Sequence, residues 1–135
     1  MCLKGHRVVQ SAFNKFKSKD LAGIFVWIPM LDSDGVASAN EEASSFTDSR
    51  IAQYWDANKA VGTAYRQLFG LTKTAWDMYL VYNPGVIWKG SQPPKPTFYM
   101  HQMNSKHGTD PAKFLKPDVF YKNVQTILTK NNEEV

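Results

Sequence analysis

The stretch that decides the fold is Gly23-Ile24-Phe25-Val26-Trp27-Ile28, an apolar run that begins at a glycine and ends before Pro29. The run shows no alternation of polar and apolar residues, which is typical of a strand buried on both faces. Such strands belong to parallel or mixed sheets that helices cover. The run therefore predicts an α/β protein with a mixed sheet.

Helical patterns lie on both sides of this strand. Residues 3–19 place apolar side chains on one face and basic and polar side chains on the other, as in an amphipathic helix. Residues 38–46 predict a short helix. A longer helix is expected between a cap at Asp56 or Asn58 and a stop at Gly70.

The rest of the chain predicts further strands and one more helix. The strands are expected at 50–55, 76–82, 86–88 and 97–103, with Asn83-Pro84-Gly85 as the turn between the second and the third. A final helix is expected to begin at Pro117. The predicted order is α, β, short α, short β, α, β, β, β, α, in a single domain of 135 residues.

Composition narrows the class of protein. The chain is 43% hydrophobic and 13% aromatic, which is typical of a globular domain. No apolar stretch approaches the roughly 20 residues that span a bilayer, and Lys4, His6 and Arg7 precede an amphipathic run instead of the apolar block of a signal peptide. We therefore expect a cytoplasmic protein without a membrane partner.

The net charge of +4 comes from the first 20 positions, where five basic residues face one acidic residue. This excess favours a solvated helix face, because a nucleic-acid surface needs a broader basic stripe and a recognisable module. We therefore expect no nucleic-acid partner. The sequence holds a single cysteine, which excludes an internal disulfide.

Cys2 stands directly before the first predicted helix. At a helix N-terminus, unpaired backbone N–H groups and the helix dipole favour a thiolate. Lys4 and His6 lie in the same turn, and His6, four residues after Cys2, is expected to stack one turn above the sulfur. We therefore predict Cys2 and His6 as the reacting pair, with Lys4 also lowering the pKa of the thiol.

Three stretches resemble a known family. The stretch 75–87, Ala-Trp-Asp-Met-Tyr-Leu-Val-Tyr-Asn-Pro-Gly-Val-Ile, resembles the strand, turn and strand of the peroxiredoxin and thiol–disulfide oxidoreductase branch of the thioredoxin-like superfamily. The stretch 25–34, Phe-Val-Trp-Ile-Pro-Met-Leu-Asp-Ser-Asp, resembles the strand and loop after that family's active-site helix. Tyr54-Trp55-Asp56 looks like the same superfamily.

The resemblance implies a thioredoxin-like mixed sheet flanked by helices, here without its first strand and with the C-x-x-C motif degenerate or truncated at Cys2. Loss of the first strand leaves an edge of the Ile24 strand open, which a second copy in a homodimer would cover. The resemblance also implies a cleft around the sulfur. Its expected residues are Trp27, Asp32, Trp55, Asp56, Ala75 and Trp76.

Three functions remain open. The leading one is a single-cysteine thiol-redox or thiol-binding module for glutathione or a thiol-bearing protein, with weak oxidoreductase activity at most and no cofactor or metal. The second is a non-catalytic binding or assembly protein with the same fold. The third is a copper-binding protein that uses Cys2, His101 and Met103, because His101 and Met103 share one face of a predicted strand.

Overall fold

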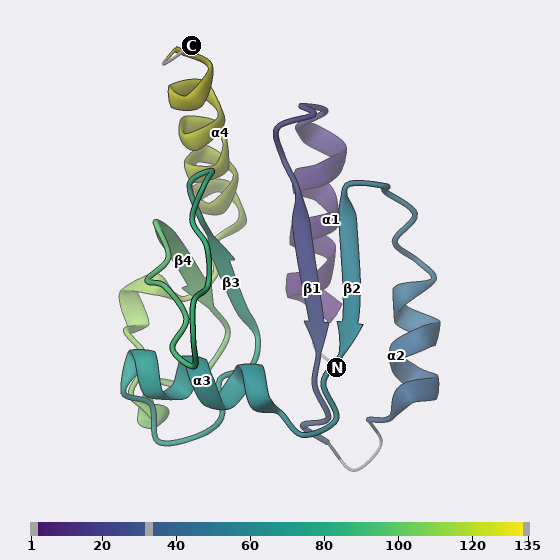
Figure 1. Ribbon diagram of the computed structural model, residues 1–135, viewed down its shortest axis with the longest axis vertical. Coiled ribbons are helices and arrows are strands. Elements are labelled where there is room, and N and C mark those ends of the chain that lie inside the picture. The colour runs from purple at the N-terminus through teal and green to yellow at the C-terminus, as the bar shows by residue number, and fades with distance from the viewer. Residues whose placement is uncertain (1–2, 32–33, 134–135) are drawn as a thin grey trace. The chain divides into compact units, whose positions relative to one another are not determined.

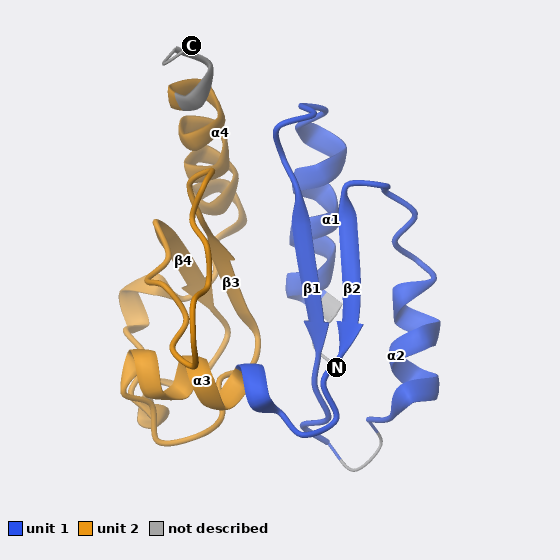
Figure 2. Ribbon diagram, in the orientation of Figure 1, with its two compact units in different colours: residues 1–61 blue, residues 62–135 orange. Residues whose placement is uncertain are grey.

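The computed structural model describes residues 3–31 and 34–133 and forms an α/β arrangement of helices and small sheets (Figure 1). This confirms the predicted class. The elements are α1 (Leu3–Lys15), β1 (Gly23–Trp27), α2 (Val36–Ala43), β2 (Ile51–Trp55), α3 (Ala60–Phe69), β3 (Met78–Val81), β4 (Phe98–His101), the 3-10 helices η1 (Ser105–His107) and η2 (Pro111–Lys113), and α4 (Pro117–Glu133). The chain divides into two compact units, residues 1–61 and 62–135 (Figure 2).

Unit 1 contains a parallel pair of strands. β1 and β2 pair in register from Gly23 with Ile51 to Trp27 with Trp55, and α2 lies in the connection between them. Among the described residues β1 pairs only with β2, so the other backbone edge of β1 has no strand partner. The described strands pair as two two-stranded sheets, a parallel pair in unit 1 and an antiparallel pair in unit 2.

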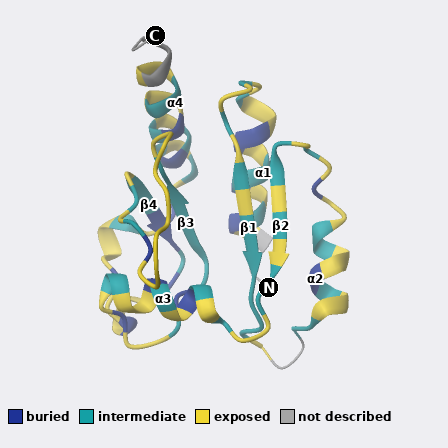
Figure 3. Ribbon diagram, in the orientation of Figure 1, coloured by how far each residue is buried: buried dark blue, intermediate teal, exposed yellow. Residues whose placement is uncertain are grey.

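The two faces of the β1–β2 pair differ in burial (Figure 3). On one face, Phe25 packs edge-on against the buried ring of Phe46, with 4.5 Å between centroids. On the other face, Ile24 is 72% exposed and Tyr54 is 59% exposed. The prediction that the Ile24 strand is buried on both faces is therefore wrong, since Ile24 lies on β1 and is itself exposed.

Arg50 connects the end of α1 to the start of β2. Its guanidinium donates to the carbonyl oxygens of Phe13 (2.7 Å), Phe16 (2.6 Å) and Ser18 (3.0 Å) and also pairs with Asp48. Carbonyls in the last turn of a helix have no partner within the helix, so an outside donor satisfies them. The Arg50 contacts lie where α1 ends, at Lys15, which is before the predicted boundary at residue 19.

Unit 2 contains the antiparallel pair, in which β3 and β4 align from Met78 with His101 to Val81 with Phe98. The predicted return strand at 86–88 is wrong, because these residues form part of an exposed loop. Gly85 and Gly90 have left-handed φ angles of 82° and 74°, and the Trp88 indole N–H donates to the Gly90 carbonyl, 2.9 Å away. Both features turn the backbone away from an extended path.

The core of unit 2 holds a chain of hydroxyl groups. Tyr82 donates its hydroxyl proton to the Pro94 carbonyl (2.8 Å), so the Tyr65 hydroxyl donates to Tyr82 (2.7 Å).

The last helix begins at Pro117, as predicted. Within the described ranges, no helix is both long and apolar enough to cross a membrane.

Candidate functional site

His6 is the centre of a polar cluster in unit 1. It lies on α1, and its side chain is only 9% exposed. Its ring stacks on Phe46 with 4.0 Å between centroids, and the Trp27 ring lies 5.5 Å away at a tilted angle. The imidazole is therefore held between aromatic rings from β1 and from the segment after α2.

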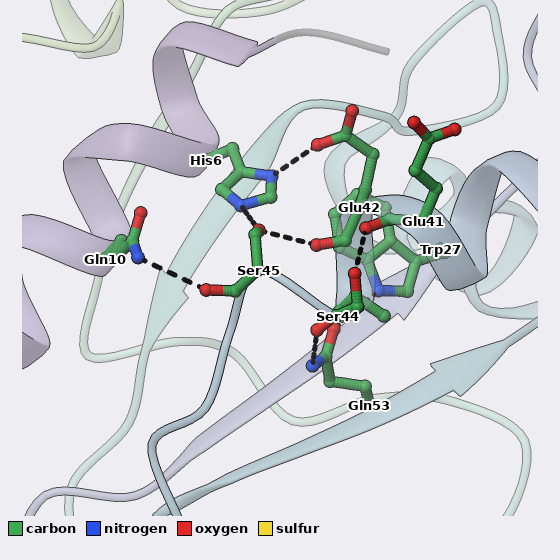
Figure 4. A network of polar contacts seen from close by, with 9 residues as sticks. His6, Gln10, Trp27, Glu41, Glu42, Ser44, Ser45 and Gln53 are labelled. Carbon is green, nitrogen blue, oxygen red and sulfur yellow. Dashed lines mark hydrogen bonds and ion pairs between the residues drawn. The ribbon is translucent and has the colours of Figure 1, made fainter.

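The two ring nitrogens of His6 have different surroundings (Figure 4). Nε2 lies 3.3 Å from the Ser45 hydroxyl oxygen. Nδ1 lies 3.8 Å from Glu42 Oε2, which is too long for a hydrogen bond. Nδ1 is buried and has no hydrogen-bond partner among the described residues.

Neighbouring amide groups hold the walls of this cluster in place. Gln53 on β2 accepts from the Trp27 indole N–H (3.0 Å) and donates to the Ala43 carbonyl at the end of α2 (3.0 Å). On α1, the amide of Gln10 reaches the Ser45 carbonyl at 3.5 Å. The cluster therefore joins α1, the end of α2 and both strands of the parallel pair (Figure 4).

Burial is the main influence on the charge of His6. It lowers the pKa of the imidazole, while the Glu42 carboxylate raises it and the Arg7 guanidinium lowers it. The net effect is a pKa below the ordinary 6.5, so His6 is mainly neutral at pH 7. A neutral imidazole can accept a proton, so His6 is suited to act as a base.

The other predicted residues at the start of the chain divide into two groups. Cys2 and Asp32 lie outside the described residues. Lys4 lies in the first turn of α1 and is exposed. The loop next to Asp32 is organised by Asp34, whose carboxylate accepts the backbone N–H groups of Met30 and Leu31.

Three predicted residues meet at the carboxyl end of the parallel strands. Trp27 and Trp55 are partners in register, and the Asp56 N–H donates to the Trp27 carbonyl at 2.9 Å. The Asp56 carboxylate accepts the backbone N–H of Val61 at 2.8 Å, which confirms its predicted capping role at the start of α3. Asp56 thus contributes to local structure at the edge where ligand sites of α/β proteins gather.

Ala75 and Trp76 belong to unit 2. Ala75 is buried, and its N–H donates to the Gly62 carbonyl at 3.1 Å. Trp76 packs near His107, with 5.7 Å between ring centroids. Both residues therefore have packing roles within their own unit.

His101 and Met103, the expected copper ligands, are almost fully buried. His101 Nδ1 accepts the Met103 N–H at 3.1 Å, so Nε2 carries the proton and donates to the Asp110 carbonyl at 2.7 Å. Neither nitrogen is left for a metal. Within the part of the chain that the structure describes, no group of three or more His, Cys, Asp or Glu side chains is arranged to hold a metal ion.

Sequence reasoning did not single out Glu42 and Ser45 as partners of His6. Ser45 is 39 positions away from His6, and no local spacing pattern indicates a contact across that distance. It also missed Asp77, which has a left-handed φ of 48° and a pKa raised by burial. Only the folded backbone reveals either feature.

In comparisons with known proteins, no family model, no curated protein and no solved structure matches the chain.

Proposed function

We propose that this chain is a single-cysteine thiol module of the thioredoxin-like type, with Cys2 as the reacting group. The order of elements supports the proposal: a helix, a parallel strand pair with a helical connection, an antiparallel pair and a final helix. This order agrees with the resemblance in the sequence stretches 25–34 and 75–87.

The observation that carries the proposal is the state of His6. It follows Cys2 by four positions in the sequence and has a buried ring nitrogen without a hydrogen-bond partner among the described residues. A buried polar atom without a partner is rare and is often connected with chemistry. In the proposed function, this nitrogen accepts the proton that Cys2 loses when it becomes a thiolate.

The proposed reaction is thiol–disulfide exchange with oxidised glutathione. The Cys2 thiolate attacks one sulfur of the disulfide, a new S–S bond joins Cys2 to that half, and the other half leaves as glutathione thiolate. Because the chain has no second cysteine, the mixed disulfide persists until an external thiol attacks it. The module therefore carries a thiol adduct and does not form an internal disulfide.

The surrounding cleft remains part of the proposal. Trp27, Trp55 and Asp56 lie together at the carboxyl end of β1 and β2 and would form one wall. The resemblance also assigns Asp32 to the cleft, and Asp32 lies outside the described residues. The aromatic rings would cover the apolar parts of the adduct.

The test is the pH dependence of alkylation at Cys2. We expect the rate of reaction with iodoacetamide to rise with a midpoint below the ordinary thiol pKa of about 8.5. We also expect a glutathione adduct by mass spectrometry after incubation with oxidised glutathione, and none in Cys2→Ser. An ordinary midpoint without an adduct would overturn the proposal.

A non-catalytic binding or assembly role is the second candidate. The exposed Ile24 and Tyr54 side chains on one face of the β1–β2 pair favour it. An apolar face of a small sheet is usually covered by another element or by a partner protein. Sedimentation over a range of concentrations tests it. A homodimer that Ile24→Lys dissociates, together with an unreactive Cys2, would favour this role.

A further inference from the structure

The hydrogen-bond pattern around His6 determines which ring nitrogen carries the proton. Ser45 donates its only hydroxyl proton to the Glu42 backbone carbonyl, 2.6 Å away. His6 Nε2, 3.3 Å from the same hydroxyl oxygen, is therefore the donor in that contact. The proton of neutral His6 lies on Nε2, and Nδ1 has a free lone pair.

This lone pair faces an acceptor. Glu42 Oε2 lies 3.8 Å from Nδ1, and neither atom supplies a proton. A charge-assisted N–H···O bond is about 2.7 to 2.9 Å long, so a shift of about 1 Å would bring the two atoms into contact. The Glu42 side chain is 32% exposed, which leaves it room to move.

We infer that Glu42 is the positioning residue for His6: its carboxylate receives the N–H that forms when His6 Nδ1 takes up a proton. In the protonated state, Nε2–H donates to Ser45 and Nδ1–H donates to Glu42, so every polar atom of the ring has a partner. The protonated ring then joins α1 to Glu42 on α2 and to Ser45 in the segment after α2. Among the described residues, the ring of neutral His6 has a hydrogen-bond contact with Ser45 alone.

Within the described ranges, two charged side chains influence the protonation of His6. Glu42 on α2 favours protonation and Arg7 on α1 opposes it, while Trp27 on β1 and Phe46 contribute aromatic rings without charge. Aromatic faces stabilise a nearby cation. The Glu41 carboxylate points away from His6 (Figure 4), so Glu41 provides a matched control for Glu42 on the same helix.

The bearing of this pair on Cys2 rests on the proposed function. There, the proton released from the Cys2 sulfur ends on His6 Nδ1, which leaves a thiolate and an imidazolium with no net change in charge. Glu42 would stabilise the imidazolium and thereby lower the pH at which the thiolate forms.

The first arm of the test follows His6 itself. An NMR titration of the imidazole, assigned with His6→Gln, gives its pKa in the wild type, in Glu42→Gln and in Glu41→Gln. We expect the pKa of His6 to fall by about half a unit or more in Glu42→Gln and to stay at the wild-type value in Glu41→Gln. Equal values in the two variants would overturn the inference.

A direct measurement in the wild type covers the case in which Glu42→Gln does not fold. Imidazole nitrogen shifts at neutral pH should place the proton on Nε2, and a hydrogen-bonded Nδ1–H signal should appear on acidification. A ring with its proton on Nδ1 at neutral pH would contradict the inferred arrangement.

The second arm measures alkylation of Cys2 in the same variants and separates the two proposals. A lowered His6 pKa in Glu42→Gln with an ordinary thiol midpoint near 8.5 would support the inference and contradict the proposed function. A low thiol midpoint with equal His6 pKa values in Glu42→Gln and Glu41→Gln would support the proposed function and contradict the inference about Glu42.

Discussion

His6 in unit 1 and His101 in unit 2 both have buried rings, and the two differ in how their ring nitrogens are used. In unit 2, His101 is fully buried and uses both nitrogens in hydrogen bonds to the backbone. In unit 1, His6 uses Nε2 and leaves Nδ1 without a partner among the described residues. A ring with both nitrogens engaged holds structure together, whereas a ring with one free nitrogen can accept a proton.

The largest expected effect comes from removing the His101 ring, in which both nitrogens are hydrogen-bonded. His101→Ala would leave the Met103 N–H and the Asp110 carbonyl without partners and open a cavity in the core. We expect a loss of about 3 to 5 kcal/mol in the free energy of unfolding, measured by urea denaturation. His6→Ala should cost about 2 kcal/mol, because only one weak hydrogen bond and the stacking on Phe46 are lost. A larger loss for His6→Ala would reverse the comparison.

The next effect is a dependence of stability on pH. Burial holds the pKa of folded His6 below 6.5, so the unfolded chain binds more protons as the pH falls through this range. We expect the contribution of neutral His6 to the free energy of unfolding to be fully present above pH 6.5. It should be lost as the pH falls toward the lower pKa of His6 in the folded state. His107 also has a pKa lowered by burial, with help from Lys73 and Lys106, and contributes in the same window.

Urea midpoints between pH 7.5 and 5.5 separate these two contributions. His6→Gln and His107→Gln should each reduce the change of the urea midpoint with pH, and the double variant should reduce this change further. A change as large in His6→Gln as in the wild type would show that His6 does not have the lowered pKa.

The smallest effects concern one hydroxyl group in each unit, Tyr82 in unit 2 and Ser45 in unit 1. Tyr82→Phe removes the donor to the Pro94 carbonyl and the acceptor for Tyr65, and should cost about 1 to 2 kcal/mol. Ser45→Ala removes an exposed hydroxyl, together with its bond to the Glu42 carbonyl and its long contact with His6 Nε2, and should cost about 0.5 kcal/mol. Thermal unfolding of both variants ranks them, and a greater loss for Ser45→Ala would contradict the ranking.

The sequence predicted the elements whose signals are local. Pro117 begins α4 as expected, and the apolar runs at 23–28 and 76–82 contain β1 and β3. The strand expected at 86–88 failed because the left-handed glycines at 85 and 90 and the nearby prolines determine a loop, although the apolar residues favour a strand. The exposure of Ile24 could not be predicted, because it depends on which face of the pair the helices cover.

The candidate site divides in the same way. The resemblance placed Trp27, Trp55 and Asp56 in one cleft, and the register of β1 and β2 brings these three residues to the carboxyl end of the parallel pair. The contacts of His6 with Ser45 and Glu42 join distant parts of the chain, and only packing of α1 against the end of α2 creates them. The same holds for His101. Both of its ring nitrogens are hydrogen-bonded only because the chain turns back and brings Asp110 next to it.

The tilted ring of Trp27, 5.5 Å from His6, gives unit 1 an internal optical reporter. An imidazolium quenches indole fluorescence more strongly than a neutral imidazole does. Acidification should therefore dim part of the tryptophan emission at the pH where His6 takes up its proton. Trp27→Phe should remove that part while the other three tryptophans continue to emit, so protonation of a single side chain can be followed in an ordinary fluorimeter.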